Sequence, residues 1–196
     1  TVEAGAIDAL TEALPALTPS RGLQALVIGW AFASFLQGVG GFGVPVAVTA
    51  PILAGLGFPP LTAVLVPSIG HAWAVTFGSL ASAFVAMVAA TGEPASLLAP
   101  ASALVLGVVG VGCGIGAAHA ATDWRETARH GLAIAGMGAA MGLSLYGLAS
   151  LGLWPIASVG AGLAGMAVGL IMAGRRTPDA ATLKRLGFGL LGYVVL

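Results

Sequence analysis

Residues 30–84 read WAFASFLQGVGGFGVPVAVTAPILAGLGFPPLTAVLVPSIGHAWAVTFGSLASAF, and this stretch decides how the chain can fold. It lies within a run from Gly22 to Gly92 that contains no Lys, Arg, Asp or Glu. At about 1.5 Å of rise per helical residue, such a run is long enough to cross a hydrocarbon core of about 30 Å twice or more. Glycines and prolines nevertheless interrupt it where an ordinary membrane-spanning helix would be continuous. The interruptions fall at residues 38–43, at Pro45, at Pro59 and Pro60, and at residues 67–71.

The composition of the whole chain is that of an integral membrane protein. Of its 196 residues, 58% are hydrophobic and only 7% are charged, and the mean hydropathy is +1.03. A soluble domain usually carries about 25% charged residues. The sequence therefore predicts an all-α, polytopic transmembrane helical bundle in the plasma membrane, with the lipid bilayer as its surroundings. Seven basic residues balance seven acidic ones, so we expect no nucleic-acid partner.

The interruptions predict discontinuous or re-entrant helices within this bundle. Non-helical backbone at membrane depth is tolerated only where it is buried in protein or lines a polar cavity. Two short pieces, residues 22–37 and 44–56, flank the glycine cluster and fit either a discontinuous helix or a re-entrant hairpin. A longer piece, residues 61–90, is interrupted around residues 67–71. We interpret these breaks as the substrate site of a transporter.

The remaining segments complete the predicted organisation. Further spans are expected at residues 97–121, 132–151 and 153–173, with a polar interfacial loop at residues 123–130. Residues 1–20 read as an amphipathic or loop segment, and residues 21–196 as a partial transmembrane domain, one repeat of a longer transporter. The remainder of that transporter is thus an expected partner.

Orientation follows from the basic residues. Four of the seven basic residues lie in the loop 174–185, so the positive-inside rule predicts that this loop is cytoplasmic. Ser20 or Thr18 is expected to cap the first spanning helix.

The glycine cluster formally matches G-x-G-x-x-G, but a dinucleotide site is rejected. Such a site needs a strand before the motif and an acid about 20 residues after it, whereas the next acid is Glu93. Close helix packing and an exposed backbone break are the remaining alternatives, and the dense glycines followed by Pro45 favour the break. A helix that begins near Val44 and Pro45 would offer unpaired N–H groups and a positive dipole end to a carboxylate.

Single polar side chains near the breaks extend this hypothesis. Gln37 is interpreted either as a donor to a substrate or as a partner of a freed backbone carbonyl. His71, which exchanges a proton near physiological pH, is the candidate proton carrier, with bridging of freed backbone groups as the alternative. Ser68 and Thr76 are expected to line a polar path or to bond their own helix. The candidate substrate-binding residues are Gln37, Gly40, Gly41, Phe42, Gly43, Val44, Pro45, Ser68 and Thr76, and the candidate proton-coupling residue is His71.

Enzyme chemistry has little support in the sequence. No region combines a pair of carboxylates, a metal-ligand set or an activated nucleophile, so we expect no catalytic residue, metal or cofactor. The single cysteine, Cys113, reads as an inert packing thiol.

The strings FLQGVGGFGVPVAVTAPILAGLGFPP (residues 35–60) and HAWAVTFG (residues 71–78) resemble the lactate permease family. The resemblance is strong over residues 29–83 and rests on hydropathy elsewhere. It implies a multi-spanning carrier of lactate or glycolate that works by proton symport and is well over twice this length. Better-known members carry Glu in place of Gln37, and an Asn-Thr-Ala-Pro run in place of residues 71–74.

The sequence thus predicts a secondary transporter for lactate or a related small monocarboxylate, with a proton or possibly sodium as the coupling ion. A Na⁺-coupled organic-anion transporter is one alternative. The other is a non-transporting membrane subunit whose glycines serve packing alone.

Overall fold

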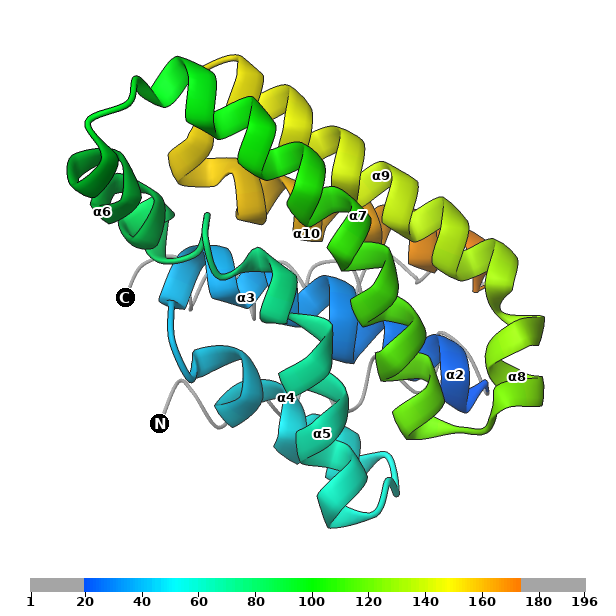
Figure 1. Cartoon of the computed structure of the whole chain (residues 1–196). Helices are drawn as coiled ribbons and strands as arrows, with labels where there is room; N and C mark the ends of the chain where they lie inside the picture. Colours follow the sequence, from blue (N-terminus) through cyan, green and yellow to red (C-terminus); the bar gives the residue numbers. More distant parts are fainter. Residues whose placement is uncertain (1–19, 174–196) are drawn as a thin grey trace, which may run out of the picture.

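The computed structural model describes residues 20–173, and every regular element in that range is a helix (Figure 1). Five helical stretches are long and apolar enough to cross a membrane, which confirms the predicted all-α polytopic bundle. They are Arg21–Gly40, Pro60–Thr91, Ala95–Ala121, Gly131–Ser150 and Trp154–Met172.

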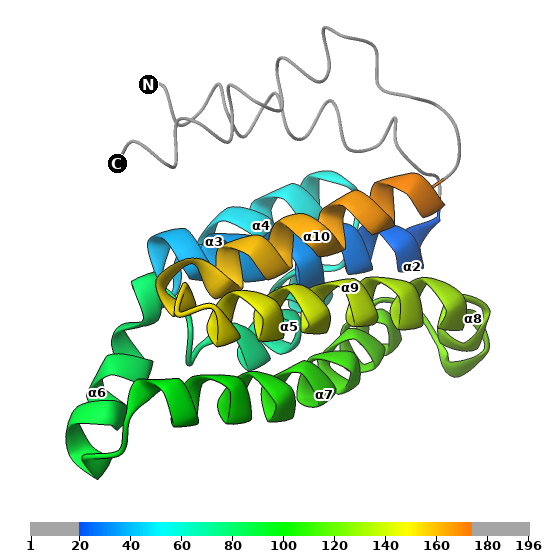
Figure 2. The same ribbon diagram turned by 90° about the horizontal axis from the view of Figure 1, so that it is seen from above.

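The first of these stretches is the central helix of the bundle. It joins α2 (Arg21–Gln24), the π-helical segment η1 (Ala25–Phe32) and α3 (Ala33–Gly40). The Ser20 hydroxyl caps it by accepting the N–H of Leu23, so one of the two predicted caps is confirmed. Buried residues make up 94% of the apolar 18-residue window of this helix but only 22% of the corresponding window of Ala95–Ala121, because the other helices surround the central helix (Figure 2).

The glycine cluster ends the central helix and starts a short helical hairpin. Gly41 and Gly43 have φ angles of 79° and 87°, which side chains disfavour, and they reverse the chain into α4 (Val44–Gly55). A turn then leads to α5 (Pro60–Gly70). Twelve and eleven residues span only about 18 Å and 16 Å, well short of a bilayer core. The predicted break between residues 22–37 and 44–56 is therefore present at the glycine cluster, and short helices follow it.

Arg21 ties the tip of this hairpin to the start of the central helix. Its guanidinium donates to the Gly57 carbonyl at 2.9 Å and lies 4.8 Å from the centre of the Phe58 ring. The tip of the hairpin thus lies at the end of the bundle where Arg21 lies.

The second interruption lies later than residues 67–71, where the sequence placed it. Pro67 is inside α5, which continues to Gly70, and the helical ladder is lost only from His71 to Ala81. One missing N–H at a proline is tolerated in a membrane helix when neighbouring groups compensate. Two 3-10 turns, η2 (Ala72–Ala74) and η3 (Ser79–Ala81), occupy the interruption, and α6 (Ser82–Thr91) follows it.

The rest of the described chain forms an antiparallel set of long helices. Its elements are α7 (Ala95–Ala121), α8 (Trp124–Arg129), α9 (Gly131–Ser150), η4 (Trp154–Ile156) and α10 (Ala157–Met172). The prediction of a loop at residues 123–130 was wrong, since α8 is a helix. Asp123 caps α8 by accepting the N–H of Glu126 at 2.8 Å, which satisfies a donor that a loop would leave to water.

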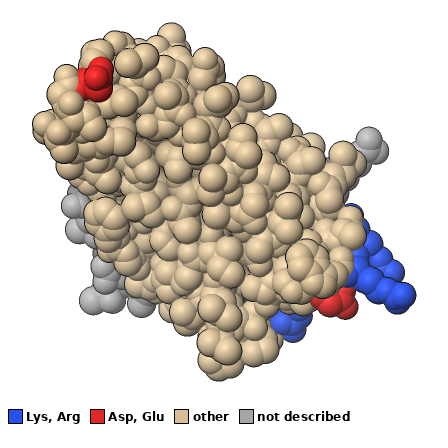
Figure 3. Space-filling view, in the orientation of Figure 1, with Lys and Arg blue, Asp and Glu red and all other residues tan. Residues whose placement is uncertain are grey.

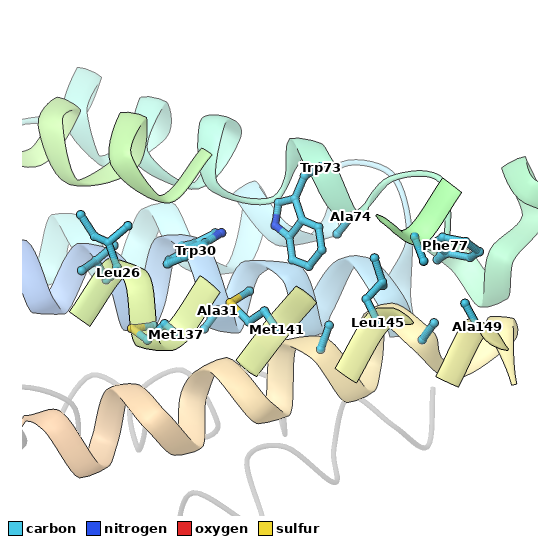
Figure 4. Close-up of a cluster of buried hydrophobic side chains, with 14 of the residues drawn as sticks. Leu26, Trp30, Ala31, Trp73, Ala74, Phe77, Met137, Met141, Leu145 and Ala149 are labelled. Carbon is cyan, nitrogen blue, oxygen red and sulfur yellow. The ribbon is translucent and has the colours of Figure 1, made fainter. Parts of the chain in front are cut away.

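Glycines of α10 let it approach the central helix closely. A Cβ at Gly162 would overlap the backbone of Phe35, and one at Gly169 would lie 2.7 Å from the Val27 side chain. On the opposite side, large apolar side chains fill the space between the central helix, η2 and α9, as Figure 4 shows for Trp30, Trp73 and Met141. The central helix is therefore held on all sides.

Charged side chains gather at the two ends of the bundle (Figure 3). Glu93 is at one end, between α6 and α7, and the remaining charges of residues 20–173 lie at the other. Those remaining charges are Arg21, Asp123, Arg125, Glu126 and Arg129. The predictions for residues 1–19, for the loop 174–185 and for residues 186–196 lie outside the described residues.

Candidate functional site

The two interruptions of the bundle touch each other. A Cβ added to Gly41, in the first interruption, would overlap the hydroxyl of Ser79 in the second. A Cβ added to Gly78 would lie 2.5 Å from the side-chain Nε2 of Gln37 and 3.0 Å from the backbone carbonyl oxygen of Gln37. The contact therefore involves residues 78 and 79, not the Pro67–His71 region that the sequence indicated.

One face of the central helix carries this contact. Trp30, Ser34, Gln37 and Gly41 follow one another at spacings of four, three and four residues, which places them on a single helical face. Trp73 of η2 binds Ser34, Gly78 meets Gln37, and Ser79 meets Gly41. The non-helical chain of the second interruption thus runs along this face toward the glycine break.

Gln37 is the most unusual side chain on that face. It is 0% exposed, and neither its Oε1 nor its Nε2 has a hydrogen-bond partner among the described residues. An amide buried in this way costs about 1–3 kcal/mol for each unsatisfied group. The alternative role from the sequence, bonding to a freed backbone carbonyl, does not occur here. Its donors and acceptor are therefore unused within the described residues.

Ser34 and Trp73 belong to the same site, although neither is among the substrate-binding residues predicted from the sequence. The Trp73 indole N–H donates to the Ser34 hydroxyl at 3.1 Å, and both residues are buried. The Ser34 hydroxyl proton itself has no acceptor among the described residues. No local signal could have paired these residues, because 39 positions separate them.

The start of α4 lies directly after the glycine break. Gly43 is the N-cap residue, and Pro45 is the second helical residue, where its missing N–H removes no helical bond. Gly41 is buried, whereas Gly40, Phe42 and Gly43 are exposed. The backbone of this break is therefore open on one side and lies against Ser79 on the other.

The dipole of α4 is the main electrostatic feature near the break. A helix of twelve residues carries about half a positive charge at its N-terminus. No Lys, Arg, Asp or Glu occurs between Gly22 and Gly92. Within this run, only backbone and amide dipoles can stabilise an anion near Val44.

The structure places the other candidate residues apart from this contact. Gly70, which precedes His71, packs on the backbone of Gly29, and Gly29 lies about 12 Å along the helix from Gln37. The Nδ1 atom of His71 is 2.5 Å from the Pro67 carbonyl of its own helix.

Two further candidate hydroxyl residues, Ser68 and Thr76, make bonds within their own part of the chain. The Ser68 hydroxyl donates to the Val64 carbonyl at 2.7 Å, so it makes the bond to its own helix that was one of its two expected roles. Thr76 accepts the N–H of Phe84 with its backbone carbonyl at 3.1 Å, and this bond holds the second interruption to α6.

Backbone strain is concentrated at the end of the second interruption. Ser79, Leu80 and Ala81 have positive φ angles of 47°, 54° and 63°, although none of them is a glycine. Each such residue costs about 1–2 kcal/mol, so the segment is stable only because its contacts hold it. The backbone is therefore strained in the segment that lies against Gly41.

We also searched the described residues for a possible metal site. Within residues 20–173, no group of three His, Cys, Asp or Glu residues lies close enough to hold a metal ion.

Comparison with known proteins identifies the family of this chain. The family model described as L-lactate permease matches residues 1–181. The L-lactate permease of Bacillus subtilis (strain 168) is 41% identical over 95 residues, which are 48% of this chain and 17% of that protein. The L-lactate permease of Escherichia coli (strain K12) is 42% identical over 79 residues, 40% of this chain and 14% of that protein. The glycolate permease of the same organism is 41% identical over 80 residues, 41% of this chain and 14% of that protein.

The aligned segments thus cover about a sixth or less of the length of these curated relatives. No solved structure gives a significant match to the chain. The family match over residues 1–181, together with the five apolar spans and the two facing interruptions, leads to one conclusion. This chain is a multi-pass membrane protein of the L-lactate permease family.

Proposed function

We propose that the chain forms part of a permease that moves lactate or a related small monocarboxylate across the plasma membrane, by proton symport. The observation that carries this proposal is Gln37, a fully buried amide without a partner, placed where two interrupted helices meet. Polar groups inside a membrane protein are costly and are found where a substrate or ion passes. The printed names of the relatives support lactate and glycolate as the substrate class.

In this proposal the substrate carboxylate lies at the glycine break. The backbone N–H groups of residues 40–43 and the start of α4 at Val44 and Pro45 hold it by their dipoles. The Gln37 amide donates a further hydrogen bond to one carboxylate oxygen. Phe42, which is 67% exposed, covers the open side of the break.

Ser34 lies one turn from Gln37 and supplies a second point of recognition. Because the Trp73 N–H already fills one acceptor position of the Ser34 hydroxyl, that hydroxyl is oriented to donate its own proton. A 2-hydroxyl group on the substrate is the natural acceptor. Residues three apart on a helix lie about 5–6 Å from each other at Cβ, which suits the length of a 2-hydroxy acid.

Proton coupling is assigned to His71. If its Nδ1–H donates to the Pro67 carbonyl, its Nε2 is left to take up a proton. Ser68 and Thr76 lie within three and five residues of it and would line the proton path. Since His71 is remote from Gln37, coupling would act through movement of the broken-helix unit against the rest of the protein.

The basic residues at one end of the bundle support a proposal for the orientation of the protein in the membrane. Arg21, Arg125 and Arg129 lie together at the end where α8 lies, and α10 returns toward it (Figure 2). We assign that end, and the loop 174–185 after α10, to the cytoplasm. Labelling of a cysteine introduced at Ala181, in intact cells and in inverted vesicles, tests this. Labelling in intact cells by an impermeant reagent would contradict it.

Uptake of radiolabelled lactate by the full-length transporter in vesicles with an imposed pH gradient tests the function. We expect Gln37→Leu to abolish uptake and Thr49→Val to retain it, because Thr49 is equally buried but donates to its own helix at 2.6 Å. His71→Gln should remove the response to the pH gradient. An unchanged response would contradict the role of His71, and uptake driven by a sodium gradient at constant pH would favour the Na⁺-coupled alternative.

A further inference from the structure

A groove lies between α7 and α9, next to α8. Its volume is about 390 Å³, within the range of about 300–1,000 Å³ that is typical of ligand sites. Its walls are Val111 and Ile115 of α7 and Ile134 and Ala135 of α9. None of these residues takes part in the site at Gln37.

The lining of the groove suits a hydrocarbon chain. Apart from the indole of Trp124 at its mouth, the only polar side chain that lines it is Thr127, whose hydroxyl donates to the Asp123 carbonyl at 2.8 Å. Since that hydroxyl is already used, a polar ligand would find little to bind inside the groove. An apolar chain would bury the exposed side chains of Ile115 and Ala135.

The mouth of the groove has the chemistry of a membrane interface. Trp124 is 65% exposed, and its ring stacks on His119 with the ring centres 4.0 Å apart. Tryptophan is enriched at the level of lipid headgroups. α8 lies at this level, since it joins two spans outside the apolar part of the bundle.

Two basic residues of α8 are sequence neighbours of residues that line the groove. Arg125 and Arg129 are one turn apart on α8, next to the groove-lining residues Trp124 and Ala128. Arg129 pairs with Glu126 at 2.9 Å, whereas Arg125 is exposed and has no ion pair among the described residues. A phosphate at the headgroup level would complement the free charge of Arg125.

We propose that this groove binds an anionic phospholipid, with one acyl chain between α7 and α9 and the phosphate beside Arg125. The apolar lining selects the chain, and the unpaired guanidinium selects an anionic headgroup over a zwitterionic one. Loss of one such charge near a membrane surface is expected to weaken binding about fivefold.

The test is a lipid titration of the purified full-length protein, followed by native mass spectrometry. Dioleoyl phosphatidylglycerol should bind more tightly than dioleoyl phosphatidylcholine, and Arg125→Gln should reduce that preference about fivefold. Ala135→Trp should fill the groove and reduce binding of both lipids. Ala139→Trp, one turn along the exposed side of α9 and outside the groove, is the matched control and should leave both unchanged.

Three results would overturn the proposal. They are equal binding of the two lipids, an Arg125→Gln variant that keeps the preference, and an Ala135→Trp variant that binds like the control. Cross-linking of Ala135→Cys to another part of the protein or to a second copy would likewise show that protein, not lipid, fills the groove.

Discussion

Gly41 lies so close to Ser79 that a single methyl group between them would overlap the serine hydroxyl. Thirty-eight residues separate the two in sequence, yet this pair closes the contact between the end of the central helix and the strained turn before α6. Both residues have positive φ angles, 79° and 47°. The contact therefore joins a backbone conformation that is open to glycine to a serine that is held in an unfavourable one.

Gly41→Ala should strongly reduce both uptake and thermal stability. Gly41 has φ 79° and ψ −154°, a region that is nearly exclusive to glycine and costs other residues about 1–3 kcal/mol. Gly43→Ala is the control, because its Cβ would meet nothing within 4 Å, so only its φ of 87° is penalised. Adding Ser79→Gly to Gly41→Ala should restore part of the stability. A double variant no better than Gly41→Ala would show that the overlap is not the cause.

Gln37→Leu should stabilise the protein while abolishing uptake. Removing a buried amide that has no partner relieves a penalty of about 1–3 kcal/mol, and leucine is of similar size. A thermal unfolding curve and a lactate uptake assay on the same variant measure both effects. If uptake persists in the stabilised variant, Gln37 has a structural role only.

Ser34→Ala should reduce the preference for lactate over propionate, which lacks the 2-hydroxyl group. Loss of one neutral hydrogen bond predicts about a tenfold smaller ratio of the two uptake efficiencies. Trp73→Phe should act in the same direction but less strongly, since it frees the Ser34 hydroxyl to turn rather than removing it. An unchanged ratio in Ser34→Ala, with uptake intact, would exclude the role of Ser34 but leave the transport proposal standing.

Leu80→Gly should raise the thermal stability, contrary to the usual effect of glycine. Leu80 is 62% exposed and has a φ of 54°, so glycine removes about 1–2 kcal/mol of backbone strain. Leu104→Gly is a matched control, because Leu104 is also 62% exposed but lies within α7. There glycine should destabilise by about 1 kcal/mol. Equal losses in the two variants would show that the turn is unstrained in solution.

Features that depend on local sequence could be predicted. The glycine break, the start of α4 near Pro45 and the turn before Pro60 follow from backbone preferences that neighbouring residues hardly change. Asp123 and Glu126 also form a local capping signal. This signal could have predicted α8, whereas the prediction for residues 123–130 was a loop.

Features set by contacts between distant segments could not be predicted. Ser79 to Ala81 adopt positive φ angles that no residue type among them favours, and only their packing against the central helix explains this. The pairing of Ser34 with Trp73 likewise depends on how the second interruption lies along α3. Pro67 wrongly indicated a break in the helix, because it is accommodated inside α5.

The burial of the first spanning helix has a consequence for biogenesis. Ribosomes deliver Arg21–Gly40 to the bilayer before the helices that will cover it, so its apolar surface first meets lipid tails. α10, which packs on it through Gly162 and Gly169, is synthesised more than a hundred residues later. Until then the side of the helix that will contact α10 is not covered by α10. The packing of the central helix against the glycine face of α10 is therefore completed only after translation has reached α10.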